Sequence, residues 1–291
     1  MIERRVAAAE RAEAVGLPSI AEEVWRYSRI DELDLDRFAP PGSVVPAATS
    51  VAAARDAGVG VRAALGSIGA VAVVANGYLA EVELSEAARA SGVRLGRLCD
   101  LDPEGVVFEA LSAEPVDVFG HLNQAFCDPL LLEIPSGVTI EEPILVVDWV
   151  DASGGALFPR LLVRLGEDAV ATLVEWHCSS EVEALVVPLI DVLVGRGARL
   201  RHLLIQDRAE SVWQLARHVS TVEQDASLTS TQAVLGGWYA RSRTDCQLVG
   251  RGASGYLNAA YFAHHDQVLD FRTFQLHAAP DTSSNCLLYT S

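Results

Sequence analysis

Four short stretches of sequence decide the fold: Gly166-Glu-Asp-Ala169, Gly195-Arg-Gly-Ala198, Glu223-Gln-Asp-Ala226 and Gly250-Arg-Gly-Ala253. Each stretch has the composition of a turn and precedes a run of residues that is typical of a β-strand. Their alanines, at positions 169, 198, 226 and 253, are 29, 28 and 27 residues apart. A second turn follows each stretch about ten residues later. The chain therefore repeats every 28 residues or so, with two strands in each repeat.

This repeat predicts a β-solenoid. Strands without helices cannot bury an apolar face within one such repeat, whereas stacked coils give every strand a partner above and below. An antiparallel sandwich with regularly spaced strands is the alternative. We expect a mainly β protein in which a small N-terminal α/β region, residues 1–128, precedes a parallel β-helix core, residues 129–291.

The N-terminal region is predicted to contain helices around one hairpin. Helices are expected at residues 2–15, after the capping box Ser19-x-x-Glu22, at 85–90 and at 114–126. The hairpin is expected at residues 71–84, where Asn76-Gly77 separates two apolar runs and favours a type I′ turn.

The charge and residue composition exclude several classes of function. The 291 residues include 22 basic and 39 acidic side chains, a net charge of -17, which disfavours binding to nucleic acid. Lysine is absent, so phosphate cradles and Schiff bases that need its amine are excluded. No apolar run approaches the roughly 20 residues of a membrane helix, and the N-terminus lacks the pattern of a signal peptide. We therefore expect a cytoplasmic protein with no membrane or nucleic-acid partner.

The densest polar cluster is His264-His265-Asp266, with His277 eleven residues further on. Alternate residues of an extended chain point to the same face, so His264 and Asp266 are candidate metal ligands together with His277. However, the triplet occupies the position of the second turn in its repeat, and a solvated corner is the simpler interpretation. We predict no catalytic residue and no resident cofactor in this chain.

A second polar group surrounds Glu175. Strand alternation places Glu175 and His177 on one face and Trp176 and Cys178 on the other, so His177 cannot activate the Cys178 thiol. The chain has five cysteines, an odd number, and no Cys-x-x-Cys pair, which favours buried structural thiols over disulfides or a zinc site.

Several motifs, in order along the chain, resemble those of the SufB/SufD family of iron–sulfur cluster assembly proteins. The first, Glu23-Val-Trp25-Arg26-Tyr27-Ser28, is similar to a motif of the SufD branch. The others are Asn76-Gly77-Tyr78, Phe119-x-x-Leu122-Asn123-x-Ala125-Phe126, Ile134-Pro135-x-Gly137-Val138 with Pro143-Ile144, the Glu175 segment, and Asp270-x-Arg272-x-x-x-x-His277-x-x-Pro280-x-Thr282-x-Ser284-Asn285.

The resemblance implies a right-handed parallel β-helix and a non-catalytic scaffold role in a SufBCD complex. It implies a SufB-like paralogue as a partner through the β-helix, and a SufC-like ATPase as a partner through a C-terminal domain. The iron–sulfur cluster would be assembled by the intact complex. A SufB-type paralogue that carries the nascent cluster is one alternative, and a β-helix enzyme acting on polysaccharides is another.

The repeat also leads to an expectation about the C-terminus. A fifth turn is due near residue 280, at Pro280-Asp281-Thr282, so the sequence ends within a coil. An open coil leaves unpaired backbone groups at its edge. The last six residues, 286–291, depart from the family pattern, and the family's later Cys-x-His motif and SufC-docking domain have no counterpart here. We expect a C-terminally truncated chain that aggregates and does not bind SufC.

Overall fold

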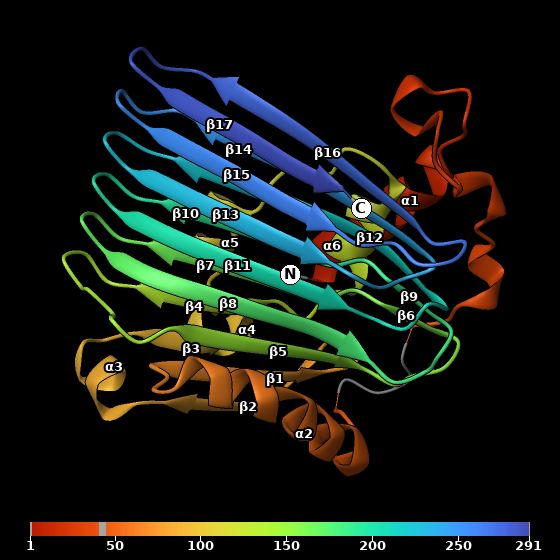
Figure 1. The fold of residues 1–291 in the computed structure, drawn as a ribbon, viewed down its shortest axis with the longest axis horizontal. Helices are drawn as coiled ribbons and strands as arrows, with labels where there is room; N and C mark the ends of the chain where they lie inside the picture. Colours follow the sequence, from red (N-terminus) through yellow and green to blue (C-terminus); the bar gives the residue numbers. More distant parts are fainter. Residues whose placement is uncertain (1, 41–44, 291) are drawn as a thin grey trace.

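The computed structural model describes residues 2–40 and 45–290. From residue 130 onward the chain winds into stacked coils of parallel strands (Figure 1). The strands of these coils are β4 (Leu130–Ile134), β5 (Ile144–Val150), β6 (Gly155–Leu157), β7 (Arg160–Leu165), β8 (Val170–Ser179), β9 (Ala184–Val186), β10 (Leu189–Val194), β11 (Arg199–Asp207), β12 (Val212–Val222), β13 (Ser227–Val234), β14 (Tyr239–Leu248), β15 (Ser254–Tyr261), β16 (Val268–His277) and β17 (Ser283–Thr290). The predicted mainly β, parallel solenoid is confirmed.

Successive strands of a coil belong to two facing sheets. One sheet has the order β17-β15-β13-β11-β8-β5, and the other has the order β16-β14-β12-β10-β7-β4. The register between coils follows the sequence period: Leu200 of β11 lies between Ala171 of β8 and Leu228 of β13. Inward and outward side chains therefore stack on equivalent side chains of the neighbouring coils.

The predicted turn stretches form one stacked corner of the solenoid. In each of them a residue with positive φ precedes the buried alanine, and asparagine, aspartate and glycine tolerate this conformation best. The residues with positive φ are Asp168, Gly197, Asp225 and Gly252 at the four stretches, and Asp281 at the expected fifth turn. Backbone hydrogen bonds join the corners, for example from Asp168 N–H to Arg196 O at 2.8 Å and from Gly197 N–H to Gln224 O at 2.8 Å. The repeat in the sequence is thus a repeat of corner geometry.

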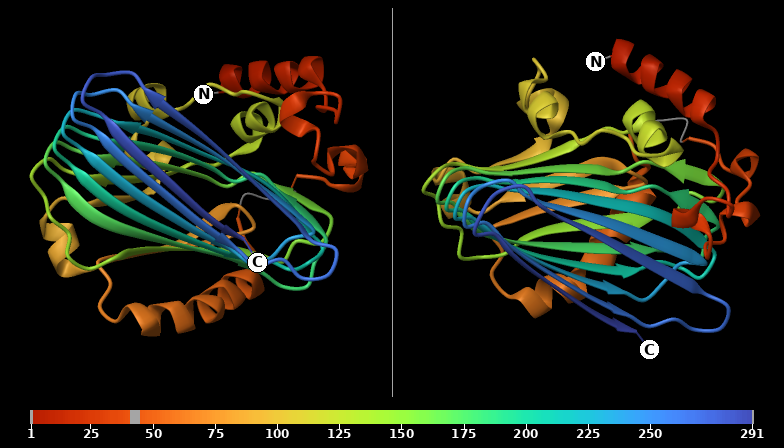
Figure 2. Two further views of the ribbon diagram at one scale, coloured as in Figure 1. Left: turned by 45° about the horizontal axis from the view of Figure 1, so that its top comes forward. Right: turned by 90° about the horizontal axis from the view of Figure 1, so that it is seen from above.

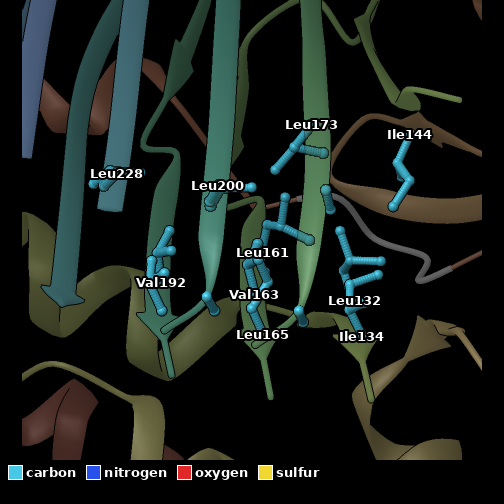
Figure 3. Packing of buried hydrophobic residues seen from close by; sticks show 14 of the residues in the cluster. Leu132, Ile134, Ile144, Leu161, Val163, Leu165, Leu173, Val192, Leu200 and Leu228 are labelled. Carbon is cyan, nitrogen blue, oxygen red and sulfur yellow. The ribbon is translucent and has the colours of Figure 1, made fainter. Parts of the chain in front are cut away.

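The largest apolar core fills the interior next to this corner (Figure 3). Each of the two facing sheets contributes large apolar side chains to it. Leu173, Leu200 and Leu228 come from one sheet, and Val163, Val192 and Val222 come from the other. The corner alanines Ala169, Ala198, Ala226 and Ala253 are at most 1% exposed and leave room for these larger side chains. Burial of this continuous apolar column is the main stabilising contribution to the coils.

The N-terminal region covers one end and two sides of the solenoid. Its elements are α1 (Ile2–Val15), η1 (Glu23–Trp25), η2 (Ile30–Glu32), η3 (Leu35–Arg37), α2 (Ala48–Leu65), β1 (Ala70–Ala75), β2 (Tyr78–Leu84), α3 (Glu86–Ala90), β3 (Arg94–Arg97), α4 (Leu98–Leu101), α5 (Val106–Leu111) and α6 (Val118–Phe126). Strand β1 pairs in parallel with β5, and β3 pairs antiparallel with β4, so both sheets continue into this region. Figure 2 shows α2 along one outer side of the coils and α1 with α6 along another.

Several predictions for this region are confirmed. The helix at residues 2–15 ends at Gly16, which has a positive φ, and the hairpin turns at Asn76 and Gly77, both of which also have positive φ. Ser85 caps α3 by accepting a hydrogen bond from the backbone N–H of Ala88. Helix α6 begins at Val118, four residues later than expected, because the side chain of Asp117 accepts a bond from Gly120 N–H and caps the helix there.

Other predictions for the fold are wrong or incomplete. The helix expected after Ser19 is only the single turn η1, although Glu22 does accept a hydrogen bond from the N–H of Ser19 as a capping box requires. Trp25 is buried against other elements, and this tertiary contact holds the segment in place of helical propensity. Helix α2 is not predicted by the sequence pattern. Two coils also contain a third short strand, β6 or β9, in addition to the two expected per repeat.

Candidate functional site in the interior of the β-helix

The interior of the coils is polar next to the apolar column. Four titratable side chains meet there: Glu175 and His177 of β8, His202 of β11 and His218 of β12. We call these four residues the interior cluster, and at most 7% of each is exposed. Strand alternation places Glu175 and His177 on one face as predicted, and that face points inward, whereas His218 arrives from the facing sheet.

Glu175 is the centre of the interior cluster. Its Oε2 lies 3.1 Å from Nε2 of His177, and its Oε1 lies 2.7 Å from Nε2 of His202. An ionised carboxylate can only accept hydrogen bonds, so both imidazoles donate through Nε2. The ring of His218 stacks on that of His202 with 6.1 Å between the centroids. One carboxylate thus orients two imidazoles, and the second of them contacts a third.

Burial and the neighbouring charges set the protonation of the cluster. Burial by itself raises the pKa of Glu175, but the hydrogen bonds and charges of His177 and His202 outweigh it and hold this pKa well below its ordinary range. Burial, with a smaller contribution from the nearby His202, lowers the pKa of His218 to about 3 against the opposing effect of Glu175. The cluster therefore contains a permanent carboxylate and, at neutral pH, an uncharged His218.

Two imidazole nitrogens of the cluster have no hydrogen-bond partner among the described residues. Nδ1 of His177 and Nδ1 of His218 are buried and form no hydrogen bond within the described part of the chain. His177 lies between two small cavities of about 30 and 10 Å³. Asp148 borders the larger cavity and Tyr261 the smaller, and each also has one buried oxygen without a partner among the described residues. Cavities of this size and polarity have room for one or a few water molecules.

A second buried polar group continues the polar interior. The Arg208 guanidinium lies 2.6 Å from the Asp148 carboxylate and donates to Gln214 Oε1 at 2.9 Å and to Cys178 O at 3.2 Å. Neither charged side chain reaches solvent, because the Arg208 side chain is 0% exposed and that of Asp148 is 4% exposed. A buried pair of this kind is stable only while both partners remain.

This arrangement is suited to holding protons and small polar molecules rather than to nucleophilic attack. Burial raises the pKa of Cys178 to about 12, so this thiol stays protonated, in agreement with its predicted structural role. Across residues 2–40 and 45–290, no group of three or more His, Cys, Asp or Glu side chains is arranged to hold a metal ion.

The structure does not bring the predicted metal candidates together. His264 and Asp266 are exposed in the corner between β15 and β16, where the N–H of His264 donates to Gln267 Oε1 at 2.7 Å. His277 is at the other end of the ten-residue strand β16, about 30 Å away at 3.3 Å per residue. Its imidazole is hydrogen-bonded to Thr282 and Ser284 instead. The solvated-corner interpretation describes His264 and Asp266 well.

Sequence reasoning recognised Glu175 and His177 but missed His202 and His218. The repeat pairs Glu175 with Leu204 and His202 with Leu173, so the contact between Glu175 and His202 is diagonal and has no signature in the period. The available signal for His202 was its place in the strand. Every second residue after the buried corner alanine points inward, and this holds for Glu175 and His177 on β8 and for His202 on β11. No comparable signal predicts the approach of His218 from the facing sheet.

None of the helices in the described residues is long and apolar enough to cross a membrane.

Comparison with known proteins finds similarity between this β-helix and iron–sulfur assembly proteins. Residues 149–290 match the family model described as the SufBD core domain of SUF system FeS cluster assembly. An iron–sulfur cluster assembly SufBD family protein of Staphylococcus epidermidis is 26% identical over 170 residues, covering 57% of this chain and 36% of that protein. The iron–sulfur cluster assembly protein SufB of Bacillus subtilis is 26% identical over 207 residues, covering 64% of this chain and 44% of that protein.

The chain therefore spans less than half the length of these curated relatives. The matched region runs from the end of β5 to β17 and contains every residue of the interior cluster. The coils of this chain are therefore similar to the SufBD core domain of iron–sulfur cluster assembly proteins.

Proposed function

We propose that this chain is a non-catalytic scaffold subunit for iron–sulfur cluster assembly, which pairs with a SufB-like paralogue and works with a SufC-like ATPase. The observation that carries the proposal is the coincidence of the matched SufBD core domain with the stacked coils of residues 149–290. The cluster is then the product of the complex rather than a resident cofactor of this chain, and a cytoplasmic location follows from that role.

The motifs near the N-terminus favour the SufD branch. The segment Glu23–Ser28 resembles the SufD motif, and its Trp25 is anchored on the β-helix by the Arg241 guanidinium, 3.9 Å from the ring centroid. A SufB-type subunit is the second candidate, because one of the relatives is SufB of Bacillus subtilis. A SufB-type subunit would hold the nascent cluster itself.

The fold argues against a β-helix enzyme that acts on polysaccharides. Such an enzyme needs carboxylates on an accessible strand face, where a sugar chain can reach them. The carboxylates of Glu175 and Asp148 instead point into the interior, and both residues are at most 4% exposed. The carboxylates of Glu175 and Asp148 are therefore out of reach of a sugar chain.

Affinity purification tests the proposal. The tagged protein is co-expressed anaerobically with the SufB-like and SufC-like proteins of its own genome, and the eluate is analysed for subunits, iron and acid-labile sulfide. We expect the SufB-like protein to co-purify, with iron and sulfide present only when all subunits are expressed. Retrieval of neither partner contradicts the scaffold role.

Reconstitution of the protein alone separates the two branches. A SufD-type subunit supplied with iron and sulfide is expected to show no more visible cluster absorption than a protein-free control, whereas a SufB-type subunit is expected to retain it. Glu175→Gln in the co-purified complex then tests whether the interior cluster contributes to assembly, with the exposed Glu181→Gln in the same coil as the control.

A further inference from the structure

The cavity of about 30 Å³ beside the interior cluster is large enough for water and is bordered by polar side chains. It lies between β1, β5 and β8 on one side and the segments that begin β7 and β10 on the other. Its lining includes the buried Glu175 and His177 as well as Asp128 and Pro159, which are partly exposed. The cavity therefore lies between the interior cluster and the surface. Because Asp148 also lines it, we call it the Asp148 cavity.

Two acceptor atoms of residues that line the Asp148 cavity receive no hydrogen bond. Asp148 on β5 and His177 on β8 are directly opposite each other in the parallel register. Oδ1 of Asp148 and Nδ1 of His177 are buried and have no hydrogen-bond partner within residues 2–40 and 45–290. Oδ2 of Asp148 accepts from Arg208 at 2.6 Å, and Nε2 of His177 donates to Glu175. A neutral imidazole that donates through Nε2 has an acceptor at Nδ1, so each side chain is held by one bond and leaves one acceptor without a donor.

His202 of the same cluster has the hydrogen bond that His177 lacks. Its Nε2 also donates to Glu175, and its Nδ1 lies 3.5 Å from the hydroxyl of Ser230, which can donate to it. The neighbour of His177 on the next strand is Gln206, whose amide bonds to a backbone carbonyl and a backbone N–H instead. The two imidazoles that flank one carboxylate therefore differ by a single hydrogen-bond donor. A small donor in the Asp148 cavity would make them equivalent.

The charges around the Asp148 cavity favour a neutral donor. The guanidinium groups of Arg160 and Arg208 disfavour a metal ion or an ammonium ion, and the carboxylates of Glu175 and Asp148 disfavour an anion. The charged side chains on and next to the cavity, other than the interior cluster, are already joined in ion pairs. These pairs are Arg160 with Asp191, Arg208 with Asp148, and Asp128 with Arg97. A donor for the two acceptors must therefore come from outside the chain.

We infer that the Asp148 cavity is a water site through which protons enter the interior cluster: exchangeable water donates one hydrogen bond to Nδ1 of His177 and one to Oδ1 of Asp148. A volume of about 30 Å³ holds about two water molecules at roughly 10–15 Å³ each. The water joins two buried polar groups that are otherwise separate. One is the pair of Asp148 with Arg208, and the other is Glu175 with His177 and His202.

Proton entry then takes place at Nδ1 of His177. A hydronium ion in the cavity gives its proton to the lone pair of Nδ1 and becomes water, and the ring becomes an imidazolium. The imidazolium keeps its Nε2–H bond to Glu175 and donates from Nδ1 to the water, so that Glu175 and His177 together become neutral. The ionisable groups around this imidazole are Glu175 on its own strand, Asp148 on β5, His202 on β11, His218 on β12 and Arg160 on β7 across the cavity.

Counting the bound water tests the inference with two matched variants. Val74→Ile adds a methylene group to the wall of the Asp148 cavity, whereas Val73→Ile adds one on the opposite face of β1, in the apolar cluster that includes Ala54 of α2. Both valines are 4% exposed. Oxygen-17 magnetic relaxation dispersion counts the long-lived water molecules of each protein. We expect Val74→Ile to hold about one such molecule fewer than the wild type, and Val73→Ile to match the wild type.

NMR of the protein labelled with nitrogen-15 histidine gives a second readout, which in the wild type needs no variant to fold. At neutral pH, Nε2 of His177 should carry the proton and Nδ1 should be an unprotonated acceptor. Exchange of the Nε2 proton with deuterium oxide should be at least about tenfold slower in Val74→Ile than in Val73→Ile, because without the water it requires local opening of the coils. Thermal unfolding shows that both variants are folded.

Three results would overturn the inference. The first is an equal number of long-lived water molecules in Val74→Ile and Val73→Ile, or equal exchange of the His177 proton in the two variants. The second is a proton on Nδ1 of His177 at neutral pH that is bonded directly to Asp148, since the two side chains would then need no water. The third is an equimolar metal ion that the purified protein retains during dialysis against a chelator and that Asp148→Asn releases, which would make the cavity a cation site.

Discussion

Oε1 of Glu175 lies 2.7 Å from Nε2 of His202, although the two residues are 27 positions apart and belong to neighbouring coils. Both side chains are buried, so this bond joins two coils through their interior. A charged hydrogen bond between coils stabilises the stacking in addition to the backbone ladder. Loss of the bond should therefore lower the stability of the coils.

Glu175→Gln should destabilise the protein by about 2–3 kcal/mol, because an amide cannot accept from both imidazoles as a carboxylate does. Urea denaturation followed by far-UV circular dichroism measures this loss. Glu181→Gln is the matched control, since Glu181 is exposed at the corner of the same coil. Equal stabilities of the two variants would contradict the assigned role of Glu175.

The lowered pKa of Glu175 also predicts a dependence on pH. A carboxyl group whose pKa is lower in the folded state binds its proton more readily in the unfolded chain, so its contribution to stability is present above about pH 4.5 and declines below it. The difference in unfolding free energy between the wild type and Glu175→Gln should therefore shrink as the pH falls from about 5 toward 3. A difference that grows on acidification would show that the two histidines do not lower this pKa.

His218 should make the stability of the protein fall as the pH drops from about 6.5 to 3. Its pKa is lowered to about 3 by burial, so over this range the unfolded chain takes up a proton that the folded chain excludes. Replacement by glutamine should flatten the pH dependence of the unfolding free energy by up to about 1.4 kcal/mol per pH unit. His265→Gln, whose imidazole is 81% exposed, should leave the profile unchanged.

Arg208→Met should cost about 3–5 kcal/mol, because it leaves the Asp148 carboxylate buried without its partner. The double variant Arg208→Met with Asp148→Leu should recover much of this loss, since it removes both charges from the interior. Chemical denaturation of the wild type, the two single variants and the double variant gives the unfolding free energies of a complete double-mutant cycle. Additive losses would show that the two side chains are not coupled.

Gly250→Ala should destabilise the coils by at least about 2 kcal/mol, because a Cβ at this position would collide with the backbone of Gln224 in the preceding coil. Gly60→Ala is the control, since a Cβ there would meet no other atom and the residue lies within α2. That control should be neutral or more stable by up to about 1 kcal/mol. The melting temperatures of the two variants test this expectation. A Gly250→Ala variant that melts at the same temperature as the wild type would mean that the corners are loosely stacked.

The sequence by itself determined the architecture of the coils. Corner residues such as Asp168 and Gly197 carry the necessary backbone preference locally, and parallel stacking repeats that preference once in every coil. Their spacing therefore predicts the period and the parallel register, and strand alternation predicts that Glu175 and His177 share a face. The hairpin at Asn76-Gly77 was predictable for the same reason, because its turn depends on the two residues themselves.

Only the tertiary structure decided which side chains meet. Glu175 reaches His202 along a diagonal between coils, and His218 approaches from the facing sheet, so neither contact follows from the period. Trp25 lies in a single helical turn instead of the expected helix, because its burial against Phe119 and Arg241 outweighs the local capping signal. Local backbone preferences set the coils, whereas the packing of side chains distant in sequence, which no local pattern encodes, assembled the interior cluster.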